Sequence, residues 1–236
     1  MKLLDGRGWR GGLVSGEGAA LEEDWELDEA QAFEHRSRAL SCARIAEQNR
    51  FLLRRYRDFQ RAADAVAAAW RDHPEVAAVA LIGSLAMAPW KEVPRFAPYR
   101  RKRIELWHEC KDLDLALWLD DLSGLDGLRR TKNKALAALH GPCEGGVASH
   151  QTDVFVLAPG SDRYLGRLCD FNRCPKGKRD CRVVGCGATA FLKQHEGFRW
   201  RPQTLAAERC HGLFDRASGR VAAAAELPLP EEGGEG

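Results

Sequence analysis

Hydrophobic residues recur at helical spacing along residues 28–72, a stretch of 45 residues without Pro or Gly. Its clearest apolar positions are Phe51, Leu52, Tyr56, Phe59, Ala62, Ala63, Val66 and Trp70. Intervals of three and four residues predict amphipathic helix with one buried face. Pro74 predicts the end of this helix, because the residue before a proline avoids helical angles. The length favours two helices, with a break near residues 46–50.

Beyond Pro74, short apolar runs alternate with turn residues. Three of these runs predict strands, at about 76–82, 111–119 and 150–157. Between the second and third, residues 125–140 have the composition of a helix that ends at Gly141-Pro142. The order of these elements predicts an α+β core.

Charged residues break the apolar pattern at three informative places. Asp112 and Asp114 lie two apart in the second predicted strand, so both point to the same face. Asp153 lies in the third predicted strand. Asp is depleted in strands, and three clustered carboxylates repel one another unless a cation neutralises them. An all-oxygen site suits Mg²⁺, and two such ions are the usual apparatus of phosphoryl and nucleotidyl transfer.

A small-residue turn, Gly83-Ser84, ends the first predicted strand. With Asp112, Asp114 and Asp153 it resembles the signature of the nucleotidyltransferase superfamily related to DNA polymerase beta. The resemblance covers residues 76–157. It implies a mixed sheet with helices on one side, and transfer of a nucleoside monophosphate from an NTP. It also implies that the three acids bind two Mg²⁺ ions, and that Gly83 and Ser84 hold the triphosphate.

One departure from that family is an insertion, since 27 residues (85–111) separate Ser84 from Asp112. The insertion carries a basic run, Arg100-Arg101-Lys102-Arg103. This run either attracts a phosphate-bearing ligand or is a solvated charged loop.

Four of the eight cysteines fall within 18 residues. They are Cys169, Cys174, Cys181 and Cys186, with the spacing Cys-x4-Cys-x6-Cys-x4-Cys. Four thiolates predict one structural zinc ion. A plain cysteine-rich loop and a redox or iron–sulfur site remain alternatives, and His195, Cys210 or His211 could replace one ligand.

Composition limits the remaining possibilities. The 236 residues are 44% hydrophobic, with no run of 18 apolar residues, and the N-terminus does not have the pattern of a secretory signal. We therefore expect a cytoplasmic protein that does not enter a membrane. A net charge of +2 does not indicate a nucleic-acid binder.

Together these patterns predict a domain organisation and a function. We expect a tail over 1–24, a nucleotidyltransferase domain over 25–160, a zinc element over 161–215 and a tail over 216–236. The predicted activity uses an NTP and an unknown acceptor, which is a small molecule, a protein or RNA. An inactive member of the same fold that binds a nucleotide or a partner, and a zinc-containing RNA-binding or scaffold protein, are the rival interpretations.

Overall fold

The computed structural model describes residues 42–87, 97–102, 104, 106–141, 146–172, 183 and 185–229. The chain divides into two compact units, Met1–Ile45 and Ala46–Gly236. The first unit is described only from residue 42 on, so the architecture reported is that of the second unit. The tail predicted over 1–24 lies outside the described residues.

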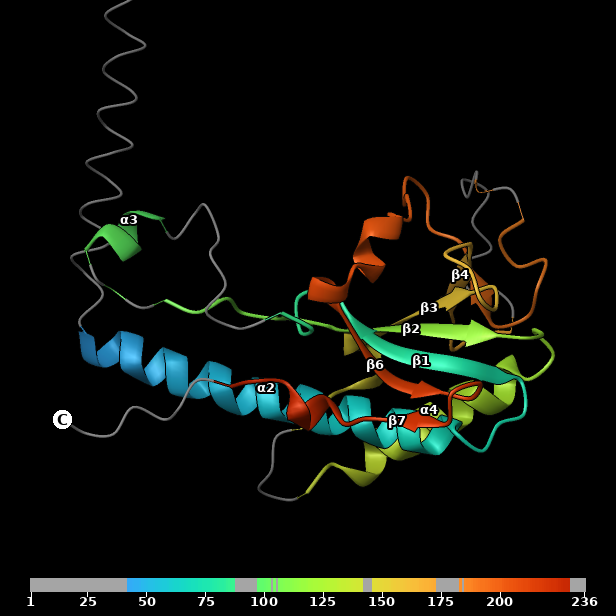
Figure 1. Ribbon diagram of the computed structural model, residues 1–236, viewed down its shortest axis with the longest axis horizontal. Coiled ribbons are helices and arrows are strands. Elements are labelled where there is room, and N and C mark those ends of the chain that lie inside the picture. The colour runs from blue at the N-terminus through green and yellow to red at the C-terminus, as the bar shows by residue number, and fades with distance from the viewer. Residues whose placement is uncertain are drawn as a thin grey trace, which may run out of the picture. The chain divides into compact units, whose positions relative to one another are not determined.

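In the described ranges the chain forms three α-helices and one sheet of seven strands (Figure 1). The helices are α2 (Cys42–Trp70), α3 (Ala97–Arg101) and α4 (Leu125–Ala138). The strands are β1 (Val76–Ile82), β2 (Leu113–Leu119), β3 (Thr152–Leu157), β4 (Tyr164–Leu168), β5 (Leu192–Lys193), β6 (Cys210–Asp215) and β7 (Arg220–Val221). Four short 3-10 helices are η2 (Ser149–Gln151), η3 (Pro202–Leu205), η4 (Ala207–Arg209) and η5 (Ala224–Glu226).

The strand order across the sheet is β5-β4-β3-β2-β1-β6-β7. β2 and β3 are parallel, and α4 connects them, whereas the other neighbouring strands are antiparallel. The prediction of an α+β fold with a mixed sheet is therefore confirmed.

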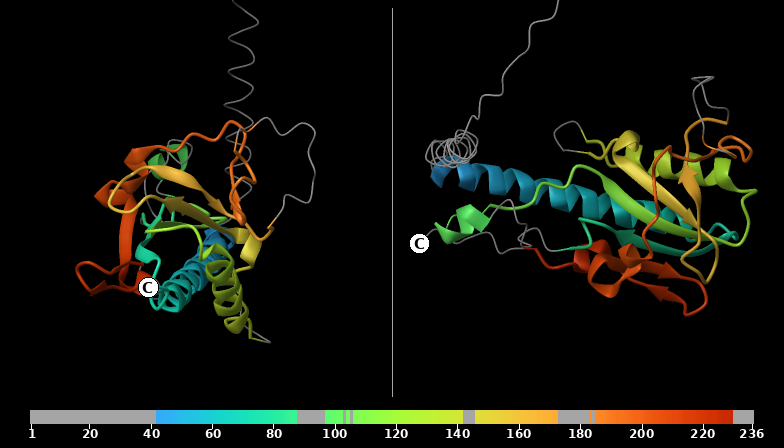
Figure 2. Two further views of the ribbon diagram at one scale, coloured as in Figure 1. Left: turned by 90° about the vertical axis from the view of Figure 1, so that its right-hand side faces the viewer. Right: turned by 90° about the horizontal axis from the view of Figure 1, so that it is seen from above.

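Helices α2 and α4 lie on one face of this sheet, as the two views in Figure 2 show. Leu113, Leu115 and Leu117 of β2 alternate onto that face and pack in the main core with Phe59 and Trp70 of α2. The opposite face carries a smaller apolar cluster. The segment between β5 and β6, orange to red in Figure 1, passes over this second face and contributes Phe198, Trp200 and Leu205 to the cluster. Alternation along the strands thus gives the sheet one face covered by helices and a second face that carries this smaller cluster and, as described below, Asp114 and Asp153.

Several predicted boundaries are confirmed and others need correction. β1 has the predicted bounds, and α4 matches the predicted helix except for its last two residues. The break predicted near residues 46–50 is wrong, because α2 runs through it as one helix of 29 residues. No Pro or Gly lies in that stretch, so no residue interrupts the backbone hydrogen bonds. β2 and β3 each begin two residues later than predicted.

The C-terminal part of the chain extends the same sheet. Four of the seven strands, β4 to β7, come from residues 164–221, across the predicted boundary between the zinc element and the tail. β6 pairs with β1, and the buried Leu213 and Ala224 join the main core. These residues therefore belong to the core architecture.

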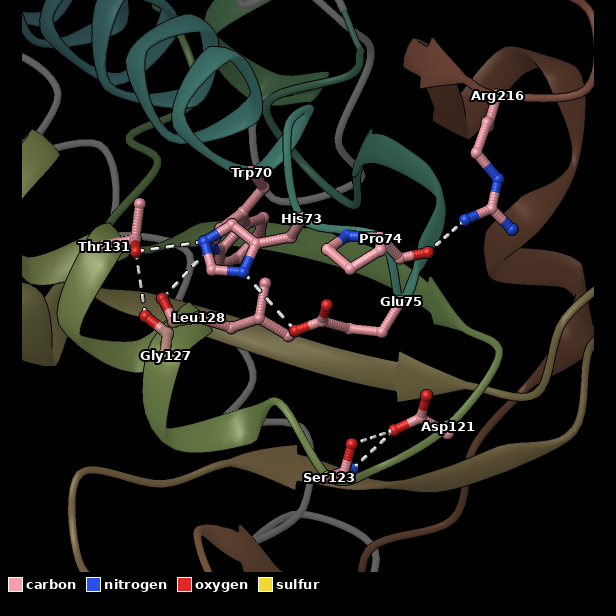
Figure 3. A network of polar contacts seen from close by, with 10 residues as sticks. All are labelled: Trp70, His73, Pro74, Glu75, Asp121, Ser123, Gly127, Leu128, Thr131 and Arg216. Atoms are coloured by element: carbon pink, nitrogen blue, oxygen red, sulfur yellow. Dashed lines mark hydrogen bonds and ion pairs between the residues drawn. The ribbon is translucent and has the colours of Figure 1, made fainter.

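A polar network fixes the end of the sheet where β1 begins (Figure 3). His73 Nδ1 is 3.4 Å from Glu75 Oε1, and His73 Nε2 is 3.1 Å from the Thr131 hydroxyl oxygen. The Trp70 indole N–H donates to the Leu128 carbonyl at 2.9 Å. These contacts tie the end of α2 and the start of β1 to the first turns of α4.

Candidate functional site

Register places two of the predicted acids side by side. In the parallel pair β2–β3, Asp114 is the partner of Asp153, and Asp114 also pairs with Ile82 at the end of β1. All three residues belong to the face opposite α2 and α4, because their strand neighbours Leu113, Leu115 and Val154 point into the main core. Asp112 lies in a bend just before β2 and is exposed. The structure therefore brings Asp114 and Asp153 together, with Asp112 at the rim.

Gly83 closes one side of this site. Its φ of +74° is a left-handed conformation that glycine adopts without strain. A Cβ atom at Gly83 would lie 2.8 Å from Asp114 Oδ2, so only glycine allows the turn to approach the carboxylate this closely. The Gly83 amide donates to the Arg209 carbonyl at 3.2 Å, while the half-buried Ser84 follows in the same turn. The insertion thus does not separate the turn from the acids.

The electrostatic environment of Asp114 is unusual for a carboxylate. Burial, followed by the charge of Asp153, raises the pKa of Asp114 from 3.8 to about 7. Arg167 opposes this rise, and Asp112 adds to it. Near neutral pH the site therefore favours either a proton on Asp114 or a neutralising cation.

Arg167 is a site residue that the sequence analysis missed. It lies on β4, and its Nη1 donates to Asp153 Oδ2 at 2.7 Å. Its guanidinium carbon lies 4.5 Å from the ring centroid of Phe155 and 4.8 Å from that of Phe198. An arginine inside the short apolar run Tyr164-Leu-Gly-Arg-Leu168 was the available signal, because a charge there needs a partner.

An aromatic cluster surrounds Arg167 on this face. Phe155, Tyr164, Phe198 and Trp200 have ring centroids 5.3 to 6.4 Å apart, and Tyr164 and Trp200 are stacked. Burial raises the pKa of the Tyr164 hydroxyl to about 12. Phe155 and Phe198 of this cluster contact the guanidinium and limit its orientation.

The carboxylate oxygens of Asp112, Asp114 and Asp153 are the kind of ligand that Mg²⁺ prefers, but the three side chains do not converge on a common position. Within the described ranges, no three His, Cys, Asp or Glu side chains stand close enough to hold a metal ion. Asp153 instead pairs with Arg167, whose positive charge stands where a cation would neutralise the carboxylate. The all-oxygen donor set and the raised pKa of Asp114 are both consistent with a hard divalent cation.

The predicted zinc ligands are described only in part. Cys174 and Cys181 lie outside the described residues. The Cys169 amide donates to the Phe191 carbonyl at 2.7 Å, and Cys186 Sγ accepts from the Gln194 amide at 3.4 Å. The four-thiolate zinc site therefore stays a prediction.

Sheet order bears on the substitute zinc ligands. Cys210 and His211 lie on β6, whereas Cys169 directly follows β4. Three strands, β3, β2 and β1, lie between β4 and β6 in the sheet. Four strand spacings amount to about 19 Å, too far for these residues to share a metal ion with Cys169. The choice among His195, Cys210 and His211 as a replacement ligand stays a prediction, because Cys174 and Cys181 lie outside the described residues. Burial raises the pKa of the Cys210 thiol.

Much of the basic insertion lies outside the described residues, namely 88–96, Arg103 and Glu105. Arg100 and Arg101 end the short helix α3, and Arg100 donates to the Leu106 carbonyl at 3.0 Å. The role of the basic run stays a prediction.

A groove of about 610 Å³ lies on the same sheet face as the acids. Small residues of β1 and β6, among them Ala78, Ala80 and Gly212, line it together with Trp118. The groove extends to Cys210, whose strand partner Ile82 is also the partner of Asp114. Asp112, Asp114 and Asp153 are not among its lining residues, which include Asp120 and Arg216 near the opposite end of β2.

Comparisons with protein-family models, with curated proteins and with solved structures return no match to this chain. In the part of the chain that the structure describes, no helix has both the length and the apolar character of a membrane span.

Proposed function

We propose that this protein is a nucleotidyltransferase that moves a nucleoside monophosphate from an NTP to an acceptor hydroxyl with the help of two Mg²⁺ ions. One observation carries the proposal: Asp114 and Asp153 are partners on parallel strands, with Gly83 packed against Asp114. The Arg167 ion pair accounts for Asp153, and the buried Asp114 beside it is the carboxylate that a metal ion would neutralise.

Each residue of the site has a distinct role in this proposal. Asp112, Asp114 and Asp153 hold the metal, which supplies charge neutralisation at the phosphates. The Gly83-Ser84 turn holds the β- and γ-phosphates, because small residues let the backbone approach them closely. Asp153 helps to remove the proton from the acceptor hydroxyl. The acceptor oxygen then forms a bond to the α-phosphorus, the bond to the β-phosphate oxygen breaks, and pyrophosphate leaves.

The groove on the same sheet face could receive part of the acceptor. Small residues, among them Ala78, Ala80 and Gly212, leave room along its floor, and its volume of about 610 Å³ lies in the range of small-molecule sites.

An inactive member of the same fold is the second candidate, and the Asp153–Arg167 ion pair favours it. An arginine that permanently neutralises Asp153 would leave only two free carboxylates for metal. Such a protein would bind nucleotide without releasing pyrophosphate.

The experiment that tests the proposal is incubation of the protein with each α-labelled NTP, Mg²⁺ and cell extract. We expect a labelled acceptor and pyrophosphate release, both reduced by a factor of about a thousand in Asp114→Asn, as for the loss of a group that stabilises transition-state charge. Asp121→Asn is the matched control, because Asp121 is an exposed carboxylate just beyond the other end of β2. Nucleotide binding without pyrophosphate release would identify the inactive member, and no Mg²⁺-dependent nucleotide binding would refute both.

A further inference from the structure

Arg167 brings a permanent positive charge to the acidic residues. Its strand partner is Phe155, two residues after Asp153 on β3, so its side chain reaches back along β3 toward the carboxylate. The ion pair is partly shielded, with 17% of the Arg167 side chain and 34% of the Asp153 side chain exposed.

The aromatic rings hold the guanidinium group in place. Phe155 and Phe198 both contact it within 5 Å of their centroids. A planar cation held against rings loses little further freedom when it binds a second anion. Arg167 is therefore pre-organised at the edge of the acidic site.

Arg167 also has N–H groups that its ion pair with Asp153 does not use. A guanidinium has five N–H donors, and in the described part of the chain Nη1 binds Asp153 while the buried Nε has no acceptor. The Tyr164 hydroxyl lies beside the guanidinium and interacts with it. Buried donors without acceptors are costly, so this corner of the site favours an additional oxygen ligand.

We propose that Arg167 is an exchangeable counterion of the site: it pairs with Asp153 while metal is absent and binds a phosphate oxygen of the nucleotide once Mg²⁺ neutralises Asp153. This inference rests on the proposed function and deepens it. Asp153 Oδ2 cannot fully serve both a metal ion and Arg167. The released guanidinium then faces the phosphates, to which its planar fork is suited.

The test measures binding rather than turnover, on the full chain and on Arg167→Gln. Electron paramagnetic resonance of Mn²⁺ without phosphate ligands reports the first half of the exchange. We expect Arg167→Gln to bind Mn²⁺ more tightly than the unsubstituted protein, because Asp153 no longer has a competing partner. Calorimetry with α,β-methylene ATP and with inorganic pyrophosphate, both at saturating Mg²⁺, reports the second half. We expect the affinity for at least one of them to fall about tenfold to a hundredfold.

Arg129→Gln is the matched control. Arg129 pairs with Asp126 at 2.7 Å and stacks on Phe191 at 5.1 Å, the same kind of arrangement on helix α4. We expect it to change neither binding measurement. If circular dichroism shows that Arg167→Gln does not fold, Arg167→Lys replaces it, with a smaller loss because Lys offers a point charge without the fork.

The outcomes separate this inference from the proposed function. Phosphate affinities that are unchanged or higher in Arg167→Gln would overturn the phosphate role, and unchanged Mn²⁺ affinity would overturn the exchange with Asp153. Both results leave the proposed function standing as long as the unsubstituted protein binds Mn²⁺ and nucleotide. A protein that binds neither would overturn the proposed function together with this inference.

Discussion

At each end of the β1–β2 pair a carboxylate packs against a glycine, but the two carboxylates have different charged neighbours. At the start of β1, Glu75 is only 8% exposed, contacts His73 at 3.4 Å and packs against Gly124 at the first turn of α4. At the other end, Asp114 packs against Gly83 and faces Asp153 and Asp112. The first carboxylate contacts His73 and the positive end of a helix, whereas the second faces two further carboxylates whose effect Arg167 opposes. Both carboxylates are largely buried, and burial is the first cause of the raised pKa of Asp114; the neighbouring carboxylates, which Glu75 lacks, add to it.

The largest expected effect is that removing the two charges changes stability in opposite directions. Asp114→Asn should stabilise the metal-free protein by on the order of 3 kcal/mol at pH 8, because it removes a carboxylate that folding makes harder to ionise. Glu75→Gln should cost about 1–2 kcal/mol, since it weakens the contact of a buried side chain with His73 and with the start of α4. Urea unfolding of both variants measures this difference.

The pH dependence of Asp114→Asn checks the cause. The pKa of Asp114 is raised from 3.8 to about 7, so between these values the folded protein holds a proton that the unfolded chain has released. The stability of the unsubstituted protein therefore falls as pH rises through this window. The gain in Asp114→Asn should be absent below it and complete above it. A gain that does not vary with pH, or the same sign in both variants, would contradict the comparison.

The sequence predicts this comparison only in part. The bounds of β1 follow from an apolar run between Pro74 and Gly83, and the alternation of Asp114 with leucines predicts which face it occupies. Local pattern also leads to Asp153. The sequence does not reveal that Glu75 packs against Gly124, because that contact depends on how α4 packs against the start of β1.

Pairing between strands far apart in the sequence explains why the place of β6 and the role of Arg167 were not predicted. β6 has six residues, and it joins β1 from more than 120 positions away, so its place in the sheet cannot be derived from local periodicity. Arg167 reaches Asp153 only because Phe155 and Arg167 are partners in the β3–β4 register. A charged residue in a short apolar run indicates that a partner exists, but not which one.

Two glycines test the packing around Glu75: Gly124, which directly precedes α4, and Gly127 in its first turn. A Cβ at Gly124 would overlap the Glu75 carboxylate, whereas at Gly127 it would lie 3.5 Å from the His73 ring, an ordinary contact. We expect Gly124→Ala to cost about 1–3 kcal/mol by displacing a buried side chain, and Gly127→Ala to gain about 0.5–1 kcal/mol as a helix substitution. Thermal unfolding measures both. Mg²⁺ and nucleotide binding should be unaffected in each variant, and a loss of binding in Gly124→Ala would show that the two ends are coupled.

The smallest expected difference in stability between two variants concerns Gly83, with Gly160 as its control. Both have left-handed backbones, with φ of +74° and +63°, so alanine at either position costs about 1–2 kcal/mol in strain. A Cβ at Gly160 meets nothing within 4 Å, whereas at Gly83 it would lie 2.8 Å from Asp114 Oδ2. Asp114 must then turn away from the turn that is proposed to hold the phosphates. We therefore expect similar losses of stability, but weaker Mn²⁺ binding only in Gly83→Ala, as measured by electron paramagnetic resonance. Equal Mn²⁺ binding in the two variants would mean that the close approach of Gly83 to Asp114 has no role in the site, and that this glycine serves the turn alone.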